Sequence, residues 1–315
     1  MSHLITLYIL ALLIYQKISS LSQMSRFLET LSHDRLTDLL DAKRDGQKLL
    51  NSFCSHCMSK VGGWLILDDT VIHKPYSKLL QSFGWIYDHS QHKAVYGMGL
   101  VLLIWTDGRI RLPIAYKLYK KGGKSRTDLA LELLSYARNR LKLKRVQGVL
   151  FDSWYSSKAI LKRIRDYGWH FYTQVKSNRC FNGKQLKHYQ RGSCWHETGS
   201  LTGGLKVLLI RRHKKFYITS NLNLEWRESY EIYRFKRQII EEVFKIIKGQ
   251  LCLCFPSDKK EHHWDYHIAL VLSAFVVLES FRRKYNLSPY KMKEELVCRT
   301  FMYKEELLES ISRCA

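Results

Sequence analysis

The chain has 315 residues, 46% of them hydrophobic, so it can bury a full core and form one large domain with an insertion, or two domains. Its 52 Lys and Arg against 28 Asp and Glu give a formal charge of +24, which disfavours a small neutral metabolite as ligand and favours an acidic polymer, above all nucleic acid. A basic surface kept for solubility is the alternative. The eight irregularly spaced cysteines indicate reduced thiols in a cytoplasmic protein rather than a disulfide framework.

The N-terminal 60 residues are expected to be helical. The apolar run Leu4–Tyr15 is shorter than the roughly 20 residues of a membrane span and lacks the flanks of a signal peptide, so it predicts a buried helix, with a membrane anchor as the alternative. Residues 23–40 have helical periodicity broken near Ser32 and Asp34, either of which could cap a second helix. This pair fits a DNA-reading helix-turn-helix, or simply a small helical bundle.

The middle of the chain predicts an α/β core with a mixed sheet. Apolar runs at 64–69 and 146–152 are typical of buried strands that end in carboxylates. The expected elements between and after them are a hairpin of strands 96–104 and 109–119 turning at Asp107-Gly108, helices at about 126–141 and 156–167, and a strand at 169–175. The resulting order βββαβαβ, with acids on the first strand, the fourth strand and a later helix, favours an RNase H-like fold.

Residues 177–226 predict a β-rich, basic insertion in this core. The expected strand-like pieces are 180–190, 195–199, 204–209 and 216–220. Most of the interleaved aromatic residues are expected to pack the insertion's own small core. The basic residues are the better candidates for contacts to nucleic-acid phosphates, with the segment Lys117–Lys124 as the alternative path; they are Lys184, Lys187, Arg191, Arg211, Arg212, Lys214 and Lys215.

Three acidic residues are candidates for a metal site. Asp69 and Asp152 end the two apolar strands, and Glu241 lies in a basic helix. Carboxylates brought together from such positions form the oxygen-rich pocket that holds two Mg²⁺ ions for phosphodiester chemistry. Asp68 is the alternative at the first position, because adjacent strand residues point to opposite faces and only one of them can reach the metals.

Two other groups of metal-ligand residues are weaker candidates. The sequence Cys54-Ser-His-Cys57 resembles half of a zinc site, but no second pair follows at the spacing of a finger or ribbon. His263 and His267 lie one helical turn apart without the Glu of a zinc peptidase between them, and an apolar helix follows. We expect these histidines to be structural or exposed.

Three sequence blocks carry a resemblance to a known family. WLILDDTVIHKPY from residue 64, GVLFDSWYSS from residue 148, and YRFKRQIIEEVFKIIKGQL from residue 233, followed by HIALVLSAFVVLE, resemble DDE transposases of the insertion-sequence type. The superfamily is the one whose helix carries a Tyr, Arg, Glu and Lys signature. The resemblance implies an RNase H-like catalytic core at 61–176 and 227–285, the β-rich insertion between them, and a helical tail at 286–315. It also implies two Mg²⁺ or Mn²⁺ ions per active site.

The resemblance also assigns roles to residues. Asp69, Asp152 and Glu241 match the three catalytic, metal-binding acids, and Arg237 and Lys248 match the basic positions of the signature helix that would contact DNA phosphates. The family tyrosine departs from the pattern here. Its place, three residues before Arg237, holds Arg234, and Tyr233 stands one residue early.

The periodicity of this helix separates Glu241 from its neighbour Glu242. With about 100° per residue, Ile240, Val243, Phe244 and Ile247 form the buried stripe. Arg237, Glu241 and Lys248 then line one flank of that stripe, and Glu242 is expected to face solvent.

We therefore expect a transposase that catalyses metal-dependent cleavage and strand transfer at the ends of a mobile element, by cut-and-paste transposition. Its partners would be double-stranded DNA, as terminal inverted repeats and target, and further copies of itself, in the cytoplasm at the nucleoid and not at a membrane. One alternative is a catalytically inactive or domesticated DNA-binding remnant of such an enzyme. Another is a basic protein anchored to the membrane through Leu4–Tyr15.

Overall fold

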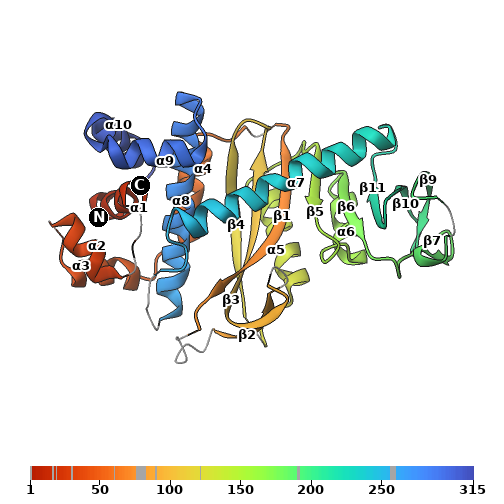
Figure 1. The fold of residues 1–315 in the computed structure, drawn as a ribbon, viewed down its shortest axis with the longest axis horizontal. Coiled ribbons are helices and arrows are strands. Elements are labelled where there is room, and N and C mark those ends of the chain that lie inside the picture. The colour runs from red at the N-terminus through yellow and green to blue at the C-terminus, as the bar shows by residue number, and fades with distance from the viewer. Residues whose placement is uncertain are drawn as a thin grey trace.

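One mixed β-sheet runs through the molecule, and helices from both ends of the chain pack together at one end of it (Figure 1). The computed structural model describes residues 2–15, 18, 20–29, 31–59, 61–75, 83–88, 91–120, 122–189, 192–255 and 260–315. The strand order is β2-β3-β1-β5-β6-β11-β10-β9-β7-β8, and β4 pairs with β3. The strands are β1 (Trp64–His73), β2 (Gly84–Asp88), β3 (Lys93–Thr106), β4 (Arg111–Tyr119), β5 (Gly148–Phe151), β6 (Phe171–Val175), β7 (Cys180–Phe181), β8 (Lys184–Gln185), β9 (Cys194–Leu201), β10 (Leu205–Arg212) and β11 (Lys215–Thr219).

The predicted hairpin is present as β3 and β4. Asp107 stabilises its turn, because its Oδ1 accepts hydrogen bonds from the backbone N–H groups of Arg109 (2.8 Å) and Ile110 (2.9 Å), while Gly108 takes φ +94°. The short strand β2 was not predicted. It forms the far edge of the sheet and exposes Trp85 and Tyr87, so it has no continuous apolar face to reveal it in the sequence.

The centre of the sheet is parallel, as expected for strands joined by helices. β1 pairs with β5 and β5 with β6, with crossover helices α5 (Arg126–Asn139) and α6 (Lys158–Asp166). Both helices lie within the predicted ranges. The mixed sheet with these crossovers is the α/β, RNase H-like arrangement that the element order indicated.

The strands of residues 180–219 continue the central sheet. β11 pairs antiparallel with β6, β10 with β11, and β9 with β10. The prediction of one strand-like piece over 180–190 was wrong in part, because Asn182 and Gly183 both take positive φ and turn the chain back after two residues. A 3-10 turn, η1 (Leu186–His188), follows β8.

The helical elements are α1 (Ser2–Ile14), α2 (Leu21–Leu28), α3 (His33–Asp41), α4 (Gly46–Ser55), α7 (Trp226–Gly249), α8 (Glu261–Tyr285), α9 (Pro289–Cys298) and α10 (Thr300–Ser312). The apolar N-terminal run is the predicted buried helix, since α1 packs against α8, α9 and α10. Ser32 caps α3 by accepting a hydrogen bond from Arg35 N (3.3 Å). By length and composition α8 is the one helix among the described residues that could cross a membrane, and 89% of its apolar window is buried, as in a core helix.

Helix α7 positions the candidate site. It crosses one face of the sheet and contacts β1, β5 and β6 (Figure 1). Its buried side chains include Ile240, Val243, Phe244 and Ile247, the four residues of the predicted stripe. The flanks of this stripe therefore decide which acidic side chains of α7 meet the strand ends.

Candidate active site

Two carboxylates lie side by side where the parallel pairing of β1 with β5 stops. The prediction that the first strand ends in a carboxylate was wrong, because β1 continues to His73 along β3 and keeps Asp68 and Asp69 inside the strand. The register of β1 with β5 pairs Leu67 with Phe151, so the residues that follow them, Asp68 and Asp152, stand at the same level. Side chains at one level of two parallel strands project to the same face. The strand pair therefore presents Asp68 beside Asp152, and both carboxylates line a cavity of about 520 Å³ at this edge of the sheet.

Asp69 faces the opposite side of β1 from Asp68. Its Oδ1 accepts a hydrogen bond from the Tyr155 hydroxyl (2.7 Å), and its Oδ2 forms an ion pair with Arg126 Nε at 3.1 Å, from the first turn of α5. Asp68 instead accepts a 2.9 Å hydrogen bond from Arg237 on α7. Asp69 lines the same cavity, but it is held by groups on the α5 side of the sheet.

The surroundings of the Asp68 carboxylate contain too little positive charge to keep its pKa at the usual value. Burial is the largest cause that raises the pKa of Asp68, to about 7, and the negative charges of Asp152 and Asp69 raise it further. The Arg237 guanidinium opposes this shift. Three acids that crowd one partly buried cavity provide the hard oxygen donors that suit Mg²⁺ or Mn²⁺.

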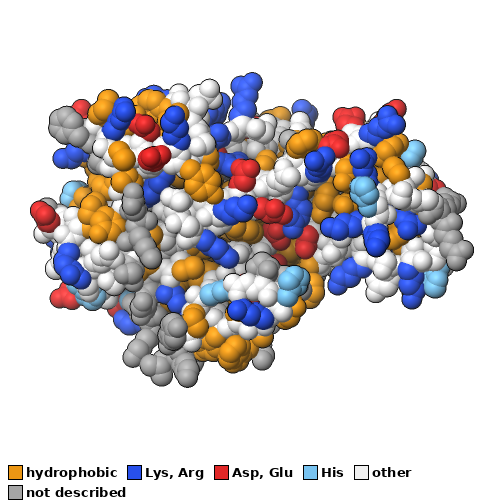
Figure 2. Space-filling view, viewed as in Figure 1, with side chains coloured by type: hydrophobic (Ala, Val, Ile, Leu, Met, Phe, Trp, Pro, Cys, Tyr) orange, Lys and Arg blue, Asp and Glu red, His pale blue; other side chains and the backbone are white. Residues whose placement is uncertain are grey.

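Glu241 reaches this site through Arg237. Arg237 Nη1 donates to Glu241 Oε1 at 2.8 Å, while Nη2 of the same guanidinium bonds to Asp68. Glu241 and Asp152 both line a second cavity of about 400 Å³, and Arg237 is a wall shared by the two cavities. Figure 2 shows acidic side chains near the centre of this face, with Lys and Arg on both sides. The structure thus brings Asp152 and Glu241 to one cleft. Asp68 lies on the other side of the Arg237 guanidinium, which binds both Asp68 and Glu241.

The remaining residues of the signature helix lie at different depths. Tyr233 lines the second cavity, and burial is the largest cause that raises the pKa of its hydroxyl, with Arg237 opposing and Asp152 adding to the shift. Arg234, at the family's tyrosine position, lines that cavity too and is more than half exposed. Lys248 is half-buried in the last turn of α7, where burial lowers the pKa of its ammonium group and the charge of Asp88 opposes the shift.

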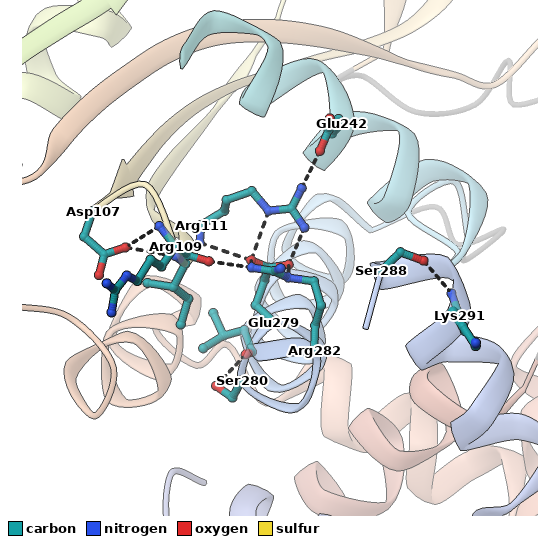
Figure 3. Close-up of polar contacts among 11 residues, drawn as sticks. Asp107, Arg109, Arg111, Glu242, Glu279, Ser280, Arg282, Ser288 and Lys291 are labelled. Carbon is teal, nitrogen blue, oxygen red and sulfur yellow. Dashed lines mark hydrogen bonds and ion pairs between the residues drawn. The ribbon is translucent and has the colours of Figure 1, made fainter. Parts of the chain in front are cut away.

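The position of Glu242 on the helix predicted that its side chain faces solvent. In the structure this side chain also has a partner. Its Oε2 accepts a 2.7 Å hydrogen bond from Arg111 Nη1, although 60% of the Glu242 side chain is exposed (Figure 3). Arg111 also binds the fully buried Glu279 of α8, which accepts a further 2.8 Å bond from Arg282. Glu242 therefore ties α7 to β4 and α8, on the flank away from Asp152. Sequence periodicity could not reveal this partner, because Arg111 is 131 residues away.

The basic residues of the insertion that we expect to contact phosphates lie on several elements. Lys215 lines the second cavity, and the pairing of Phe216 with Val175 brings it beside Lys176 at the edge of the sheet that carries Asp152. The nearby aromatic side chains pack on one another as expected, with Phe181 and Phe216 buried. Arg191 lies outside the described residues. The other cations are Lys184 on β8, Lys187 in η1, Arg211 and Arg212 on β10, and Lys214 in the β10–β11 turn.

Several residues of the cavity were not identified from the sequence as site residues. Arg126 and Lys176 line it, and Lys176 Nζ lies 5.0 Å from the centre of the Trp154 ring. The capping box formed by Ser125 and Asp128 fixes the start of α5 and therefore the place of Arg126. That box is visible in the sequence, but its position opposite Asp69 depends on the sheet.

The two weaker metal candidates have other partners. Cys54 Sγ donates to the Pro113 carbonyl oxygen and Cys57 Sγ contacts Ser280, so these thiols point into the protein. His267 Nδ1 bonds to the Tyr8 hydroxyl at 2.8 Å, and burial lowers the pKa of its imidazole to about 3. His263 contacts Asp41 on α3, together with His262 and Lys260. Asp41, His262 and His263 are the one set of three metal-ligand groups in the described part of the chain whose ligand atoms all lie within 4.8 Å of one another, so the carboxylates of the candidate active site stand further apart.

Comparison with known proteins gives a family match and a fold match. The family profile described as a transposase DDE domain matches residues 61–263, and no curated protein matches the chain. Among solved structures, the fold is similar to the piggyBac transposase in its synaptic complex with hairpin DNA, with a TM-score of 0.56 and 13% identity over 99% of this chain and 71% of that chain. The Mos1 mariner paired end complex with Mn aligns at a TM-score of 0.20 and 14% identity, over 52% of this chain and 56% of that chain.

Proposed function

Because the chain belongs to the transposase DDE domain family, we propose that it cleaves DNA at the ends of a mobile element and joins those ends to target DNA, with the aid of divalent metal ions. The observation that carries the proposal is the placement of Asp68 beside Asp152, just past the last pair of β1 with β5, with Arg237 linking Asp68 to Glu241 on α7. Three carboxylates in that relation fit a site for Mg²⁺ or Mn²⁺.

Asp68, Asp152 and Glu241 are the residues that would hold two ions. Asp68 is favoured over Asp69 for the first position, because it shares a face with Asp152 and contacts α7, whereas Asp69 is already bound by Tyr155 and Arg126. Asp69 then acts as a positioning residue that ties β1 to Tyr155 and to α5. Bound ions would make a water or a 3′-hydroxyl nucleophilic and stabilise the leaving oxygen.

The basic residues of the cleft suit a phosphate substrate. Arg237 balances the charges of Asp68 and Glu241, and its planar guanidinium can also bind a phosphate with two parallel hydrogen bonds. Tyr233 and Lys215 line the same cavity and could reach the backbone of a bound strand. Lys248 would contribute a point charge from the far end of the signature helix.

Double-stranded DNA is the proposed partner, as terminal repeat and as target. The formal charge of +24 supports an acidic polymer, and the piggyBac transposase, which shares the fold, was determined with hairpin DNA. Joining both ends of one element requires an active site at each end, so we propose that the protein works on DNA as an oligomer.

The proposal is tested with a supercoiled plasmid that carries the DNA flanking this gene on both sides. Purified protein with Mg²⁺ or Mn²⁺ should nick it at fixed positions at the element's ends, and EDTA should stop the reaction. Asp152→Asn should bind the plasmid without nicking it. A wild-type protein that binds these ends but never cuts them with either metal would support the DNA-binding remnant instead.

A further inference from the structure

A second basic cavity lies outside the candidate active site, between α6 and the insertion. Its volume is about 220 Å³, several times the roughly 30 Å³ share of one water molecule. Four cations line it, Lys158, Lys162 and Arg165 of α6 and Arg179 of the β6–β7 loop, and no described acidic residue does. A cavity with this lining is suited to a compact anion.

The spacing of α6 explains how one helix supplies three of these cations. Residues 158, 162 and 165 stand at intervals of four and three, so they follow one flank of the helix. The other face of α6, with Ile160 and Ile164, is buried against the core, and the buried Leu161 lies between that face and the cavity. The basic flank therefore has a fixed orientation.

The β9–β10 turn forms the opposite wall and is shaped around Lys158. Gly203 takes φ +97°, and a Cβ atom there would approach Lys158 Cε to 2.8 Å and Nζ to 3.0 Å. A side chain at this position would therefore displace the ammonium group as well as strain the backbone. Gly203 leaves room for Lys158 along the turn, beside Thr202, which also lines the cavity.

Arg179 has unused hydrogen-bonding capacity. Its Nε is buried and has no hydrogen-bond partner among the described residues, and burial lowers the pKa of its guanidinium. The backbone of Arg179 is fixed on both sides, because its N–H donates to Lys176 O (3.0 Å) and its carbonyl accepts from Leu186 N (2.9 Å). A buried donor without a partner carries a free-energy cost that an anion bound there would offset.

The cavity is connected to the candidate active site through one turn of chain. Lys176, whose carbonyl binds the Arg179 N–H, lines the active-site cavity beside Trp154. A polyanion whose reacting phosphate lies near Asp152 would next contact Lys176 and then the α6 cavity. Spaced phosphates on one backbone are what a DNA strand offers.

We propose that the cavity formed by Lys158, Lys162, Arg165 and Arg179 binds a backbone phosphate of duplex DNA that extends away from the cleavage site. This inference rests on the proposed function, because it names a second contact for the same DNA. The contact is to the backbone, so it should add affinity without adding sequence preference.

The test compares two double variants of equal charge. Lys162→Gln/Arg179→Gln removes two cations from the cavity, and the control Lys144→Gln/Arg163→Gln removes two exposed cations that do not line it, one on the same helix. Binding of a fluorescent duplex with one end of the element is measured by anisotropy over a range of salt concentrations. The cavity variant should flatten the log-log salt dependence by up to about one unit, because one phosphate contact is lost, and the control by much less.

Ethylation of single phosphates then locates the contact. One ethylated phosphate outside the cleavage site should weaken binding of the wild type and of the control, but not of the cavity variant, which has already lost that contact. Equal salt slopes in the two double variants, or the same ethylation pattern in all three proteins, would overturn the inference while leaving the proposed function intact. A wild-type protein that does not bind the duplex at all would instead contradict the proposed function.

Discussion

Arg237 Nη2 donates a 2.9 Å hydrogen bond to Asp68 Oδ2, and this contact fixes which flank of α7 meets the strand ends. The same guanidinium binds Glu241, so the acid of β1 and the acid of α7 share one cation. Glu242, the next residue on α7, reaches Arg111 on the other flank. The two adjacent glutamates therefore belong to different clusters, and they should respond differently to mutation.

Glu241→Gln should abolish metal-dependent cleavage, because an amide removes the negative charge that would hold a divalent ion. Glu242→Gln should keep most of the cleavage activity and lower the stability by less than about 1 kcal/mol, since this side chain is largely exposed and the amide oxygen can still accept from Arg111. Plasmid nicking and thermal denaturation of both variants check this. Loss of cleavage in Glu242→Gln alone would mean that α7 docks in another rotation.

The β10–β11 turn should contact DNA more strongly than β8 and η1. Lys214 and Lys215 lie at the edge of the sheet that carries Asp152, whereas Lys184 lies 5.7 Å from the centre of the Tyr189 ring. Lys214→Gln/Lys215→Gln should flatten the salt dependence of DNA binding by about one unit per lost contact and leave the sequence preference unchanged. Lys184→Gln/Lys187→Gln serves as the comparison. If neither pair changes the slope, the DNA path lies elsewhere, with Lys117–Lys124 as the next segment to mutate.

Lys293 should make stability depend on alkaline pH. Its ammonium group is buried and donates to the Leu12 and Tyr15 carbonyl oxygens at 2.5 and 3.0 Å, and burial lowers its pKa from 10.5 to about 8. The unfolded chain therefore holds more protons than the folded one between pH 8 and 10.5, so this residue's contribution to stability rises with pH across that window. Two and a half pKa units correspond to at most roughly 3 kcal/mol.

This contribution is the difference between the free energies of unfolding of wild type and Lys293→Met, measured by urea denaturation at pH 7.5, 9 and 10. The difference cancels the effects of the cysteines and tyrosines that titrate in the same pH range. The stability of the wild type relative to the variant should increase with pH. A difference that stays constant from pH 7.5 to 10 would show that the Lys293 pKa is not lowered in the folded protein.

The sequence predicted those parts of the molecule that depend on local pattern. Strand-forming residues and the Asp107-Gly108 turn located the β3–β4 hairpin, and the apolar stripe placed Glu241 on the flank of α7 that carries Arg237. Our preference for Asp68 over Asp69 rests on the pairing of Leu67 with Phe151, which joins strands more than 80 residues apart in the chain. The partner of Glu242 and the neighbours of Arg179 are long-range contacts of the same kind, with no periodic signal in the sequence.

The most direct test of the metal site exchanges the carboxylates of Asp68 and Asp69, one at a time, for a thiolate. A thiolate is a softer ligand, which binds Mn²⁺ better than Mg²⁺, so a true metal ligand changed to Cys should lose cleavage in Mg²⁺ and recover part of it in Mn²⁺. The ratio of plasmid cleavage rates in Mn²⁺ and Mg²⁺ is measured for Asp68→Cys and Asp69→Cys against wild type. The structure predicts a strongly raised ratio for Asp68→Cys and a wild-type ratio, at reduced rates, for Asp69→Cys. A raised ratio for Asp69→Cys with a wild-type ratio for Asp68→Cys would contradict the proposed site.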